Sequence, residues 1–405
     1  MTTSETLDDI DLTNPDAFVA GVPHEWFTRL RREAPVHWHP ESDGPGFWTV
    51  TSYDDFVIVN RDWETYSSMR GAVFMWDIPE AALEQQRMLM LNMDPPLHTR
   101  YRLLINKGFT PRMVNALEDT MRDRTREILD RVAERGECDF VVDVAAELPL
   151  QVIADLMGVP QEDRHKLFDW SNRMIGAEDP EYGLTEEDTA IASMELYAYA
   201  AELANQKRAN PGEDLISVLS TKAEVDGEQL SGLEIDLFFL LLSVAGNETT
   251  RNLISHGLVA LLEHPDQLAR LRANPDLMGS TIEEMLRWAS PVMQFRRTAM
   301  VDHELHGQPI KEGDKVVFWH ISANRDETKF ADPFTFDITR SPNEHVAFGG
   351  GGPHFCLGAN LARMEIRVMF EELLARFPEM EITGEVSRLR SNFINGIKHI
   401  PLRVS

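Results

Sequence analysis

The feature of this chain that most restricts its fold is a run of four glycines followed closely by a cysteine. Residues 348–363 read F-G-G-G-G-P-H-F-C-L-G-A-N-L-A-R, so Cys356 stands just before a segment with the pattern of a helix start. Glycines allow the backbone to approach another group closely. A cysteine beside a helix N-terminus meets the positive end of the helix dipole and free backbone N–H groups, which stabilise a thiolate. A thiolate is the kind of ligand that soft or redox-active metals prefer.

Three other interpretations of this run are weaker. An isolated cysteine beside a flexible loop is usually a buried thiol. A phosphate-binding loop would end in Lys-Ser or Lys-Thr, and a dinucleotide-binding loop needs a preceding strand and a later acidic residue. A zinc site needs ligands at suitable spacing, and His354 stands too close to Cys356 to form such a pair. None of the three accounts for the whole run.

A second unusual motif interrupts the longest apolar segment, residues 233–262. The string A-G-N-E-T-T begins at Ala245 and contains Gly246, Glu248 and Thr249. Glycine destabilises a helix interior by about 1 kcal/mol relative to alanine. A buried carboxylate destabilises it further unless it is paired. Such residues in an apolar helix favour a functional site over the alternative, a helix kink solvated by water.

These motifs resemble the signatures of the cytochromes P-450, which are haem-thiolate enzymes. The match includes Phe-Gly with further glycines, His two residues before the cysteine, Gly two residues after it, and the A-N-L-A-R helix start. Phe348 stands eight residues before Cys356 instead of the family's usual seven, so the loop has one extra residue. The resemblance implies that Cys356 is the axial thiolate ligand of haem b (iron protoporphyrin IX). It also implies that His354 lies near a haem propionate and that Gly358 belongs to the cofactor site.

The resemblance assigns roles within the apolar segment as well. It places Ala245 and Gly246 in an oxygen-binding groove, and it gives Thr249 and Glu248 the delivery of protons. This assignment is chemically reasonable because a threonine hydroxyl can hold a hydrogen-bonded water and an acid can reload it from solvent.

Two further charged motifs follow the family's order. Glu284 and Arg287 stand three residues apart, on one face of a helix. Alone, they would be an ordinary solvated pair, but they resemble the family's E-x-x-R motif. Arg340 stands where the family has a third residue that locks this pair, and all three receive a structural role.

The remaining motif predicts anchors for the propionates. His98 and Arg102 stand four residues apart after D-P-P, hence on one face of a helix. Alone, they favour a basic surface turn. By resemblance they bind one haem propionate and Arg297 binds the other, through charge-assisted hydrogen bonds.

The predicted fold is mainly α with minor β, as one cytochrome P-450 domain over residues 1–405. Its β-rich part lies near 35–60 and 297–320 and at the C-terminus, where apolar runs flank an E-S-D-G-P-G turn and predict a hairpin. Its helical part covers about 90–290 and 356–377. The haem should lie between a long central helix and the cysteine loop.

Composition excludes several other classes of protein. Lys and Arg number 39 against 67 Asp and Glu, giving a net charge of -28, whereas nucleic-acid binding requires a basic face. The start M-T-T-S-E-T-L-D-D-I-D-L lacks the features of a signal peptide, and no stretch reaches the ~20 apolar residues of a membrane span. Two cysteines, Cys138 and Cys356, exclude a disulfide framework and predict a reducing, cytoplasmic location.

The resemblance implies a monooxygenase that inserts one atom of O2 into a C–H bond of a hydrophobic small molecule. The chain has no flavin or iron–sulfur segment, so we expect electrons from a ferredoxin and a ferredoxin reductase. An acidic ferredoxin would dock on basic residues at the cysteine side of the haem. The candidates are Arg100, Arg102, Lys107, Arg112, Arg363 and Arg367.

The substrate pocket is predicted from family position and is apolar, aromatic and flexible, which suits a substrate with few polar groups. Its residues are Phe74, Met75, Trp76, Met88, Leu91, Val292, Phe295, Phe393 and Ile394.

The string at 245–252, the extra loop residue and the ending N-G-I-K-H at 395–399 resemble a bacterial subgroup that acts on sterols, methyl-branched lipids and terpenoids. The alternatives are another oxidation, such as coupling or desaturation, and a non-enzymatic haem-binding sensor. Glu248 and Thr249 favour oxygen activation, and a sensor would normally carry an output module, which this sequence lacks.

Overall fold

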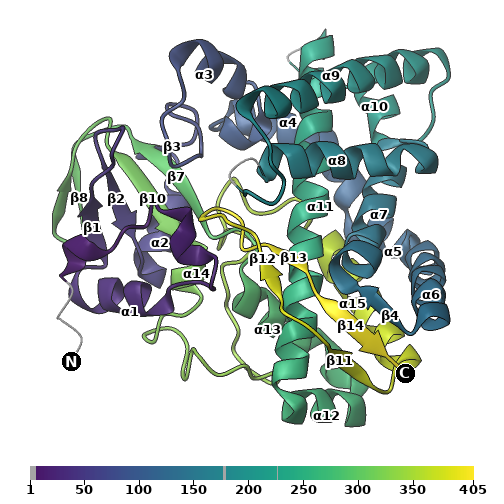
Figure 1. The fold of residues 1–405 in the computed structure, drawn as a ribbon. Helices are drawn as coiled ribbons and strands as arrows, with labels where there is room; N and C mark the ends of the chain where they lie inside the picture. The colour runs from purple at the N-terminus through teal and green to yellow at the C-terminus, as the bar shows by residue number, and fades with distance from the viewer. Residues whose placement is uncertain (1–5, 177–178, 226) are drawn as a thin grey trace.

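The computed structural model describes residues 6–176, 179–225 and 227–405. One long helix, α11 (Gly232–Glu263), crosses the centre of the molecule (Figure 1). It begins with a capping box in which the Ser231 hydroxyl accepts the N–H of Glu234 and the Glu234 carboxylate accepts the N–H of Ser231. Every residue from 250 to 261 is buried, as expected for a helix that is apolar on all sides. The predicted long central helix is confirmed.

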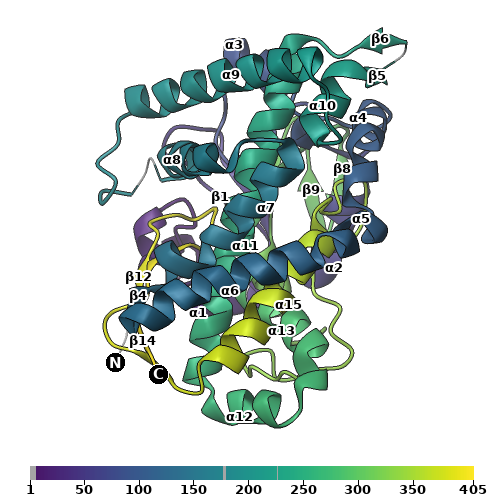
Figure 2. The same ribbon diagram turned by 90° about the vertical axis from the view of Figure 1, so that its right-hand side faces the viewer.

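Shorter helices surround α11 and form most of the fold. Helices α7, α8, α9, α13 and α15 pack directly against α11, and α15 crosses α6 (Figure 2). The apolar pattern of residues 113–132 is interrupted at Leu117, between α5 and α6. The surrounding helices are α3 (Glu80–Gln86), α4 (Leu97–Ile105), α5 (Pro111–Ala116), α6 (Glu118–Arg135), α7 (Glu147–Met157), α8 (Arg164–Ile175), α9 (Glu186–Ala209), α10 (Leu215–Thr221), α12 (Pro265–Ala273), α13 (Met278–Ala289) and α15 (Ala359–Arg376).

A five-stranded sheet lies to one side of the helices (Figure 1). Its strand order is β1-β2-β10-β7-β3, and β1 and β2 form the predicted antiparallel hairpin, with Val36 opposite Val50. Strand β10 joins this hairpin in parallel and pairs with β7 in antiparallel fashion. The elements of this part are β1 (Val36–His39), β2 (Phe47–Val50), β3 (Tyr66–Ser67), β7 (Gln294–Ala299) and β10 (Lys315–Trp319), with α1 (His24–Glu33), α2 (Tyr53–Arg61) and α14 (His320–Ala323) beside them.

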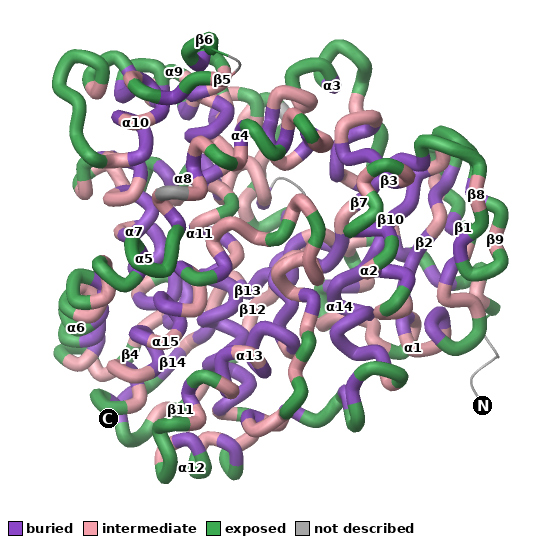
Figure 3. The backbone as a smooth tube through the Cα atoms, turned by 180° about the vertical axis from the view of Figure 1, so that it is seen from behind, coloured by how far each residue is buried: buried purple, intermediate pink, exposed green. Residues whose placement is uncertain are grey.

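Smaller sheets complete the structure. Strands β11, β14 and β4 form one sheet, and three pairs of short strands form β12–β13, β5–β6 and β8–β9. Buried backbone gathers around α11, α13 and the five-stranded sheet, whereas the outer turns of α6 and α12 are exposed (Figure 3). Among the described residues, no helix is long and apolar enough to cross a membrane. The strands are β4 (Glu137–Asp139), β5 (Glu224–Val225), β6 (Glu228–Gln229), β8 (His303–Leu305), β9 (Gln308–Ile310), β11 (Met380–Ile382), β12 (Ser387–Arg388), β13 (Ile397–His399) and β14 (Pro401–Val404).

A buried ion pair joins α13 to the irregular chain that precedes the cysteine. Glu284 and Arg287 are both fully buried, and their side chains form two hydrogen bonds of 2.7 and 2.8 Å. Arg340 donates to the same carboxylate at 3.1 Å. The three residues therefore have the arrangement expected from the sequence, and their contacts are structural.

Removal of the Arg287 guanidinium should strongly destabilise the protein, because it leaves the buried Glu284 charge poorly compensated. We expect Arg287→Ala to lower the free energy of unfolding by about 3–5 kcal/mol. A matched control is Arg403→Ala, which breaks an exposed pair with Glu381 and should cost less than about 1 kcal/mol. Urea unfolding of both variants measures this, and equal effects would contradict the structural role.

Candidate functional site

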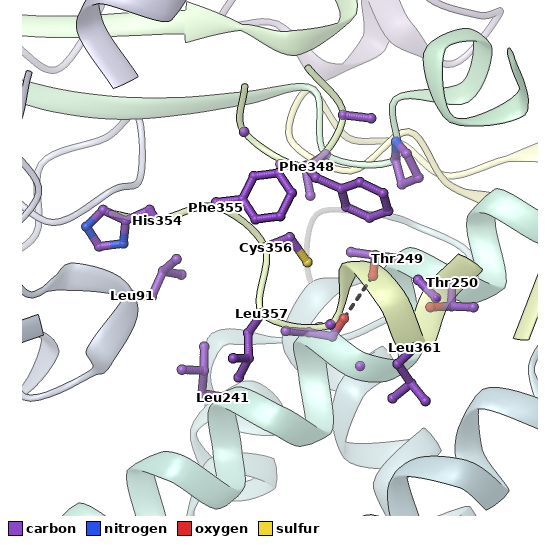
Figure 4. A pocket seen from close by; sticks show the side chains of 18 of the residues that line it. Leu91, Leu241, Thr249, Thr250, Phe348, His354, Phe355, Cys356, Leu357 and Leu361 are labelled. Atoms are coloured by element: carbon purple, nitrogen blue, oxygen red, sulfur yellow. Dashed lines mark hydrogen bonds between the residues drawn. The ribbon is translucent and has the colours of Figure 1, made fainter. Parts of the chain in front are cut away.

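Cys356 lies at the end of the glycine loop, and its sulfur faces a cavity beside α11 (Figure 4). The Cys356 N–H donates to the carbonyl oxygen of Phe348 at 3.0 Å, which closes the loop. The four glycines, 349–352, have φ angles of 97°, 63°, 103° and 80°. Side chains rarely tolerate such angles, which explains the glycine run. Helix α15 begins at Ala359, as the sequence predicted.

Without a metal, the Cys356 side chain is a thiol. Burial raises the pKa of its thiol, and the N–H of Gly358 and the charges of Arg102 and Arg363 oppose this only in part. The sequence predicted a stabilised thiolate, but removal of the sulfur from water outweighs the local dipoles. A bound metal cation would supply the missing charge, because a coordinating thiol loses its proton.

Two arginines face the cavity without a carboxylate partner. Arg297 is 3% exposed and donates to the Arg296 carbonyl oxygen at 2.9 Å and to Oδ1 of Asn60 at 3.0 Å. Arg102 donates to the Pro353 carbonyl oxygen at 3.3 Å. In the described part of the chain, no ion pair reaches either guanidinium, and burial lowers the pKa of Arg297 to about 10. A buried cation without a counter-ion is costly, so this edge of the cavity suits a ligand that carries carboxylates.

Two histidines complete this edge, in the neutral state. The rings of His98 and His354 lie 4.3 Å apart, and both residues line the cavity. Burial, followed by the nearby arginine charges, lowers the pKa of His98 to about 4 and that of His354 well below its usual value. Without a ligand both rings are therefore neutral at pH 7, and a carboxylate beside them would raise their pKa again.

Helix α11 forms the wall near the cysteine through Ala245, Gly246, Thr249 and Thr250. A Cβ atom on Gly246 would lie 2.9 Å from Cδ1 of Ile153 on α7, so a larger residue here would require that side chain to shift. The Thr249 hydroxyl donates to the Ala245 carbonyl oxygen at 2.8 Å (Figure 4).

Glu248 does not line the cavity, although its neighbour Thr249 does. Its side chain is 1% exposed and forms an ion pair with Arg251, one helical turn further along. Burial raises the pKa of Glu248, the Arg251 charge lowers it, and Oε1 has no hydrogen-bond partner. Glu248 lies roughly a third of a turn from the face that Thr249 shares with the cavity, because successive residues are rotated by about 100°.

The cavity fits a flat, largely apolar group with a metal at its centre and carboxylates at one edge. The Cys356 sulfur would be the metal ligand on one side, α11 lies on the other, and Arg102 and Arg297 would pair with the acidic groups. Most of the remaining lining is apolar, including Leu241, Leu242, Leu253, Phe348 and Phe355.

Comparison with known proteins agrees with this geometry. The sequence model of the family described as cytochrome P450 matches residues 21–392. The chain belongs to this family. It is 44% identical over 397 residues to a steroid C26-monooxygenase of Rhodococcus jostii, covering 96% of this chain and 83% of the relative. It is 45% identical over 386 residues to a methyl-branched lipid omega-hydroxylase of Mycobacterium tuberculosis, covering 93% and 90%.

Solved structures give the same result. A cytochrome P-450 of Mycobacterium marinum in complex with pseudoionone superposes with a TM-score of 0.92 at 40% identity, covering 100% of this chain and 99% of that one. The predicted family and mainly α fold are thereby confirmed. The chain is a cytochrome P-450 monooxygenase, and this family binds haem through a cysteine thiolate and uses O2 on hydrophobic substrates.

Only part of the predicted substrate pocket lines the cavity of this P-450. Leu91, Val292 and Phe295 do so. Phe393 contacts Phe295 from behind, with ring centroids 5.7 Å apart. Met75 instead packs in the N-terminal core. The six predicted residues outside the lining are Phe74, Met75, Trp76, Met88, Phe393 and Ile394.

The second layer is mainly aromatic. Phe74 stacks on Trp76 at 5.4 Å and meets Phe393 at 5.7 Å. These rings therefore support the wall that Phe295 presents. The sequence indicated loops beside the cavity. It could not show which side chains reach the cavity surface, because family position identifies a loop and not the direction of a side chain.

The predicted basic patch is also smaller than expected. Arg102 faces the cavity, Arg363 pairs with Glu283, and Arg367 pairs with Glu118. Acidic neighbours thus neutralise Arg363 and Arg367. Arg100 and Arg112 are exposed, while the side chain of Lys107 lies outside the described residues.

The sequence analysis missed a buried carboxyl group, Glu365 on α15. It is 2% exposed and lines the cavity, where it accepts a hydrogen bond from Thr250, and its Oε2 atom has no partner. Burial raises its pKa to about 8. The one sequence signal was an acid between Met364 and Ile366, on the buried side of a helix.

The proton on Glu365 should make stability depend on pH. The folded protein keeps this proton up to about pH 8, whereas the unfolded chain loses it near pH 4.5. Between these values, ionisation of Glu365 in the unfolded chain lowers the free energy of unfolding as the pH rises. The Glu365→Gln variant should therefore gain stability relative to the parent over this window, by at most about 1.4 kcal/mol per pH unit. Unfolding at several pH values measures the difference. Glu381→Gln, at an exposed site, is the control, and a pH-independent difference would contradict the assignment.

Proposed function

We propose that this chain hydroxylates a hydrophobic lipid-like molecule, namely a sterol, a methyl-branched lipid or a terpenoid, at a haem b held by Cys356. The observation that carries the proposal is the cavity in which the Cys356 sulfur faces an apolar space closed by α11. The names of the relatives, a steroid monooxygenase and a methyl-branched lipid hydroxylase, support the substrate class.

The arginines and histidines at one edge of the cavity would hold the cofactor. Arg297 and Arg102 would each bind a propionate, with His98 and His354 as hydrogen-bonding neighbours. Haem bound in this way supplies the activation of O2 and the transfer of one oxygen atom. The donor set fits this role because the buried Arg297 and the half-buried Arg102 lack carboxylate partners within the described residues.

The cavity walls favour apolar substrates. Apart from the propionate edge and Glu365, the lining consists mainly of aliphatic and aromatic side chains, with Leu241, Leu242 and Phe295 among them. Burial of each additional CH2 group stabilises a bound substrate by about 0.8 kcal/mol. We therefore expect selectivity for size and shape instead of recognition of many polar groups.

Spectral titration of the purified protein tests this substrate class. We expect steroids, methyl-branched fatty acyl lipids and terpenoids to shift the Soret band, whereas a nucleoside of similar size should not. Product analysis after turnover should then show a hydroxylated molecule. A coupled or desaturated product would show that the enzyme catalyses another oxidation instead of hydroxylation. Binding of the ligand without any product, under full electron supply, would favour a non-enzymatic haem-binding sensor.

Thr249 is proposed to deliver protons, which it would receive from one of two acids, Glu248 or Glu365. Its hydroxyl faces the cavity and can turn from the Ala245 carbonyl to a substrate-side water. Glu248 could reach that water only after leaving Arg251, whereas Glu365 already lines the cavity and keeps a proton at neutral pH. Both acids are thus candidate sources.

Removal of the Thr249 hydroxyl should separate proton delivery from substrate binding. We expect Thr249→Val to reduce product formation by roughly 100-fold while the spectral dissociation constant for the substrate stays within about twofold. Thr249→Ser keeps the hydroxyl and should retain most of the activity. If the valine variant formed product at the parental rate, the role of Thr249 would be refuted.

Electrons are proposed to come from an acidic ferredoxin served by its reductase, docking beside α4 and α5. Arg112 is exposed on α5, and the apolar side chains of Met113 on α5 and Leu103 on α4 are also exposed. We expect Arg112→Glu to slow reduction by reduced ferredoxin roughly tenfold at low ionic strength. The effect should shrink as salt increases. Arg32→Glu, on α1, is the control, and equal rates for the two variants would count against this surface.

A further inference from the structure

The glycine loop is held in place from outside, by the end of α2. Ordering a flexible backbone costs about 1–2 kcal/mol per residue, and glycines cannot offset this with side-chain contacts. Arg61 donates to the Gly350 carbonyl oxygen at 2.9 and 2.6 Å. Asn60 donates through Nδ2 to the Gly349 and Gly351 carbonyl oxygens, the latter at 3.0 Å. The longer loop is therefore fixed by two adjacent side chains of another element.

The same Asn60 amide also contacts Arg297. Its Oδ1 atom accepts a hydrogen bond from the Arg297 guanidinium at 3.0 Å, and Asn60 is 4% exposed and lines the cavity. Backbone carbonyls only accept and a guanidinium only donates, so a side chain between them must present a donor on one side and an acceptor on the other. An amide meets this demand. A carboxylate would turn an acceptor toward the carbonyls, and leucine would satisfy neither side.

We propose that Asn60 is a positioning residue that holds Arg297 and the cysteine loop in register for one rigid ligand. The inference rests on the proposed function, in which that ligand is haem. Arg297 would hold the acidic edge of the haem, and Cys356 would hold its iron. Because the haem is rigid, it requires a fixed distance between these two residues. Among the described residues, Asn60 is hydrogen-bonded to both the loop and Arg297. A shift of about 1 Å in either residue would therefore strain the contact between the haem and the other residue.

The test compares Asn60→Asp and Asn60→Leu with Arg61→Gln. Arg61 contacts the loop but not Arg297, so its variant removes loop support alone. Haem loss to an excess of acceptor apoprotein and the absorption band of the reduced carbon monoxide complex are measured. We expect both Asn60 variants to lose haem at least roughly tenfold faster, the equivalent of about 1.4 kcal/mol. In Asn60→Leu, part of the red-shifted thiolate-type band should move to shorter wavelength, and Arg61→Gln should stay within about twofold of the parent.

A double-mutant cycle separates coupling from local loop folding. If Asn60 acts through Arg297, Asn60→Asp should accelerate haem loss much less in an Arg297→Gln background than in the parent. Additive effects, parental behaviour of the Asn60 variants, or an equal effect of Arg61→Gln would each overturn the proposal. If Asn60→Leu does not fold, the isosteric Asn60→Asp decides. Failure of the parent protein to bind haem would refute the proposed function instead, before any variant is compared.

Discussion

The position of the cysteine depends on one buried carboxylate, Glu284. It accepts hydrogen bonds from Arg287 at 2.7 and 2.8 Å, from the N–H of Asp337 at 2.9 Å and from Arg340 and Asn343 at 3.1 Å each. The chain from 324 to 355 has no helix or strand, so it needs such a fixed point. Arg287 also donates to the carbonyl oxygens of Asn324 and Pro333, which ties the start of this segment to α13.

A second constraint acts nearer the site, where charges are buried without partners of opposite sign. The edge of the cavity collects Arg102, Arg297 and two neutral histidines. Cys356 is also held in a less ionised state than a free cysteine. The arginine charges without carboxylate partners cost free energy in the protein alone, and a ligand with carboxylates would relieve that cost. A metal at the sulfur would favour the Cys356 thiolate. The site is thus built for a cofactor, and binding of that cofactor should contribute to stability.

The sequence predicted those parts of the fold that depend on local pattern. The β1–β2 hairpin follows from apolar runs around a turn, α11 from a continuous apolar segment, and the start of α15 from the string after Cys356. The spacing of Glu284 and Arg287 puts them on one face of a helix, but their structural role came from the resemblance to the family's E-x-x-R motif.

The missed features arise from contacts between distant segments. Asn60 contacts a loop residue 291 positions away in the sequence, and Glu365 accepts a hydrogen bond from Thr250 of another helix. Neither partner is visible in local sequence. Glu248 was assigned by motif, yet rotation along α11 turns it toward Arg251. Phe74 and Phe393 came from the correct loops, but packing against Phe295 decides that they form a second layer.

The absorption spectrum of the purified, dithionite-reduced protein under carbon monoxide tests the central claim most directly. The account predicts a strongly red-shifted Soret band of the thiolate type, which Cys356→Ala abolishes while Cys138→Ala leaves it unchanged. Absence of haem, a band typical of histidine ligation, or an unchanged band in Cys356→Ala would contradict it.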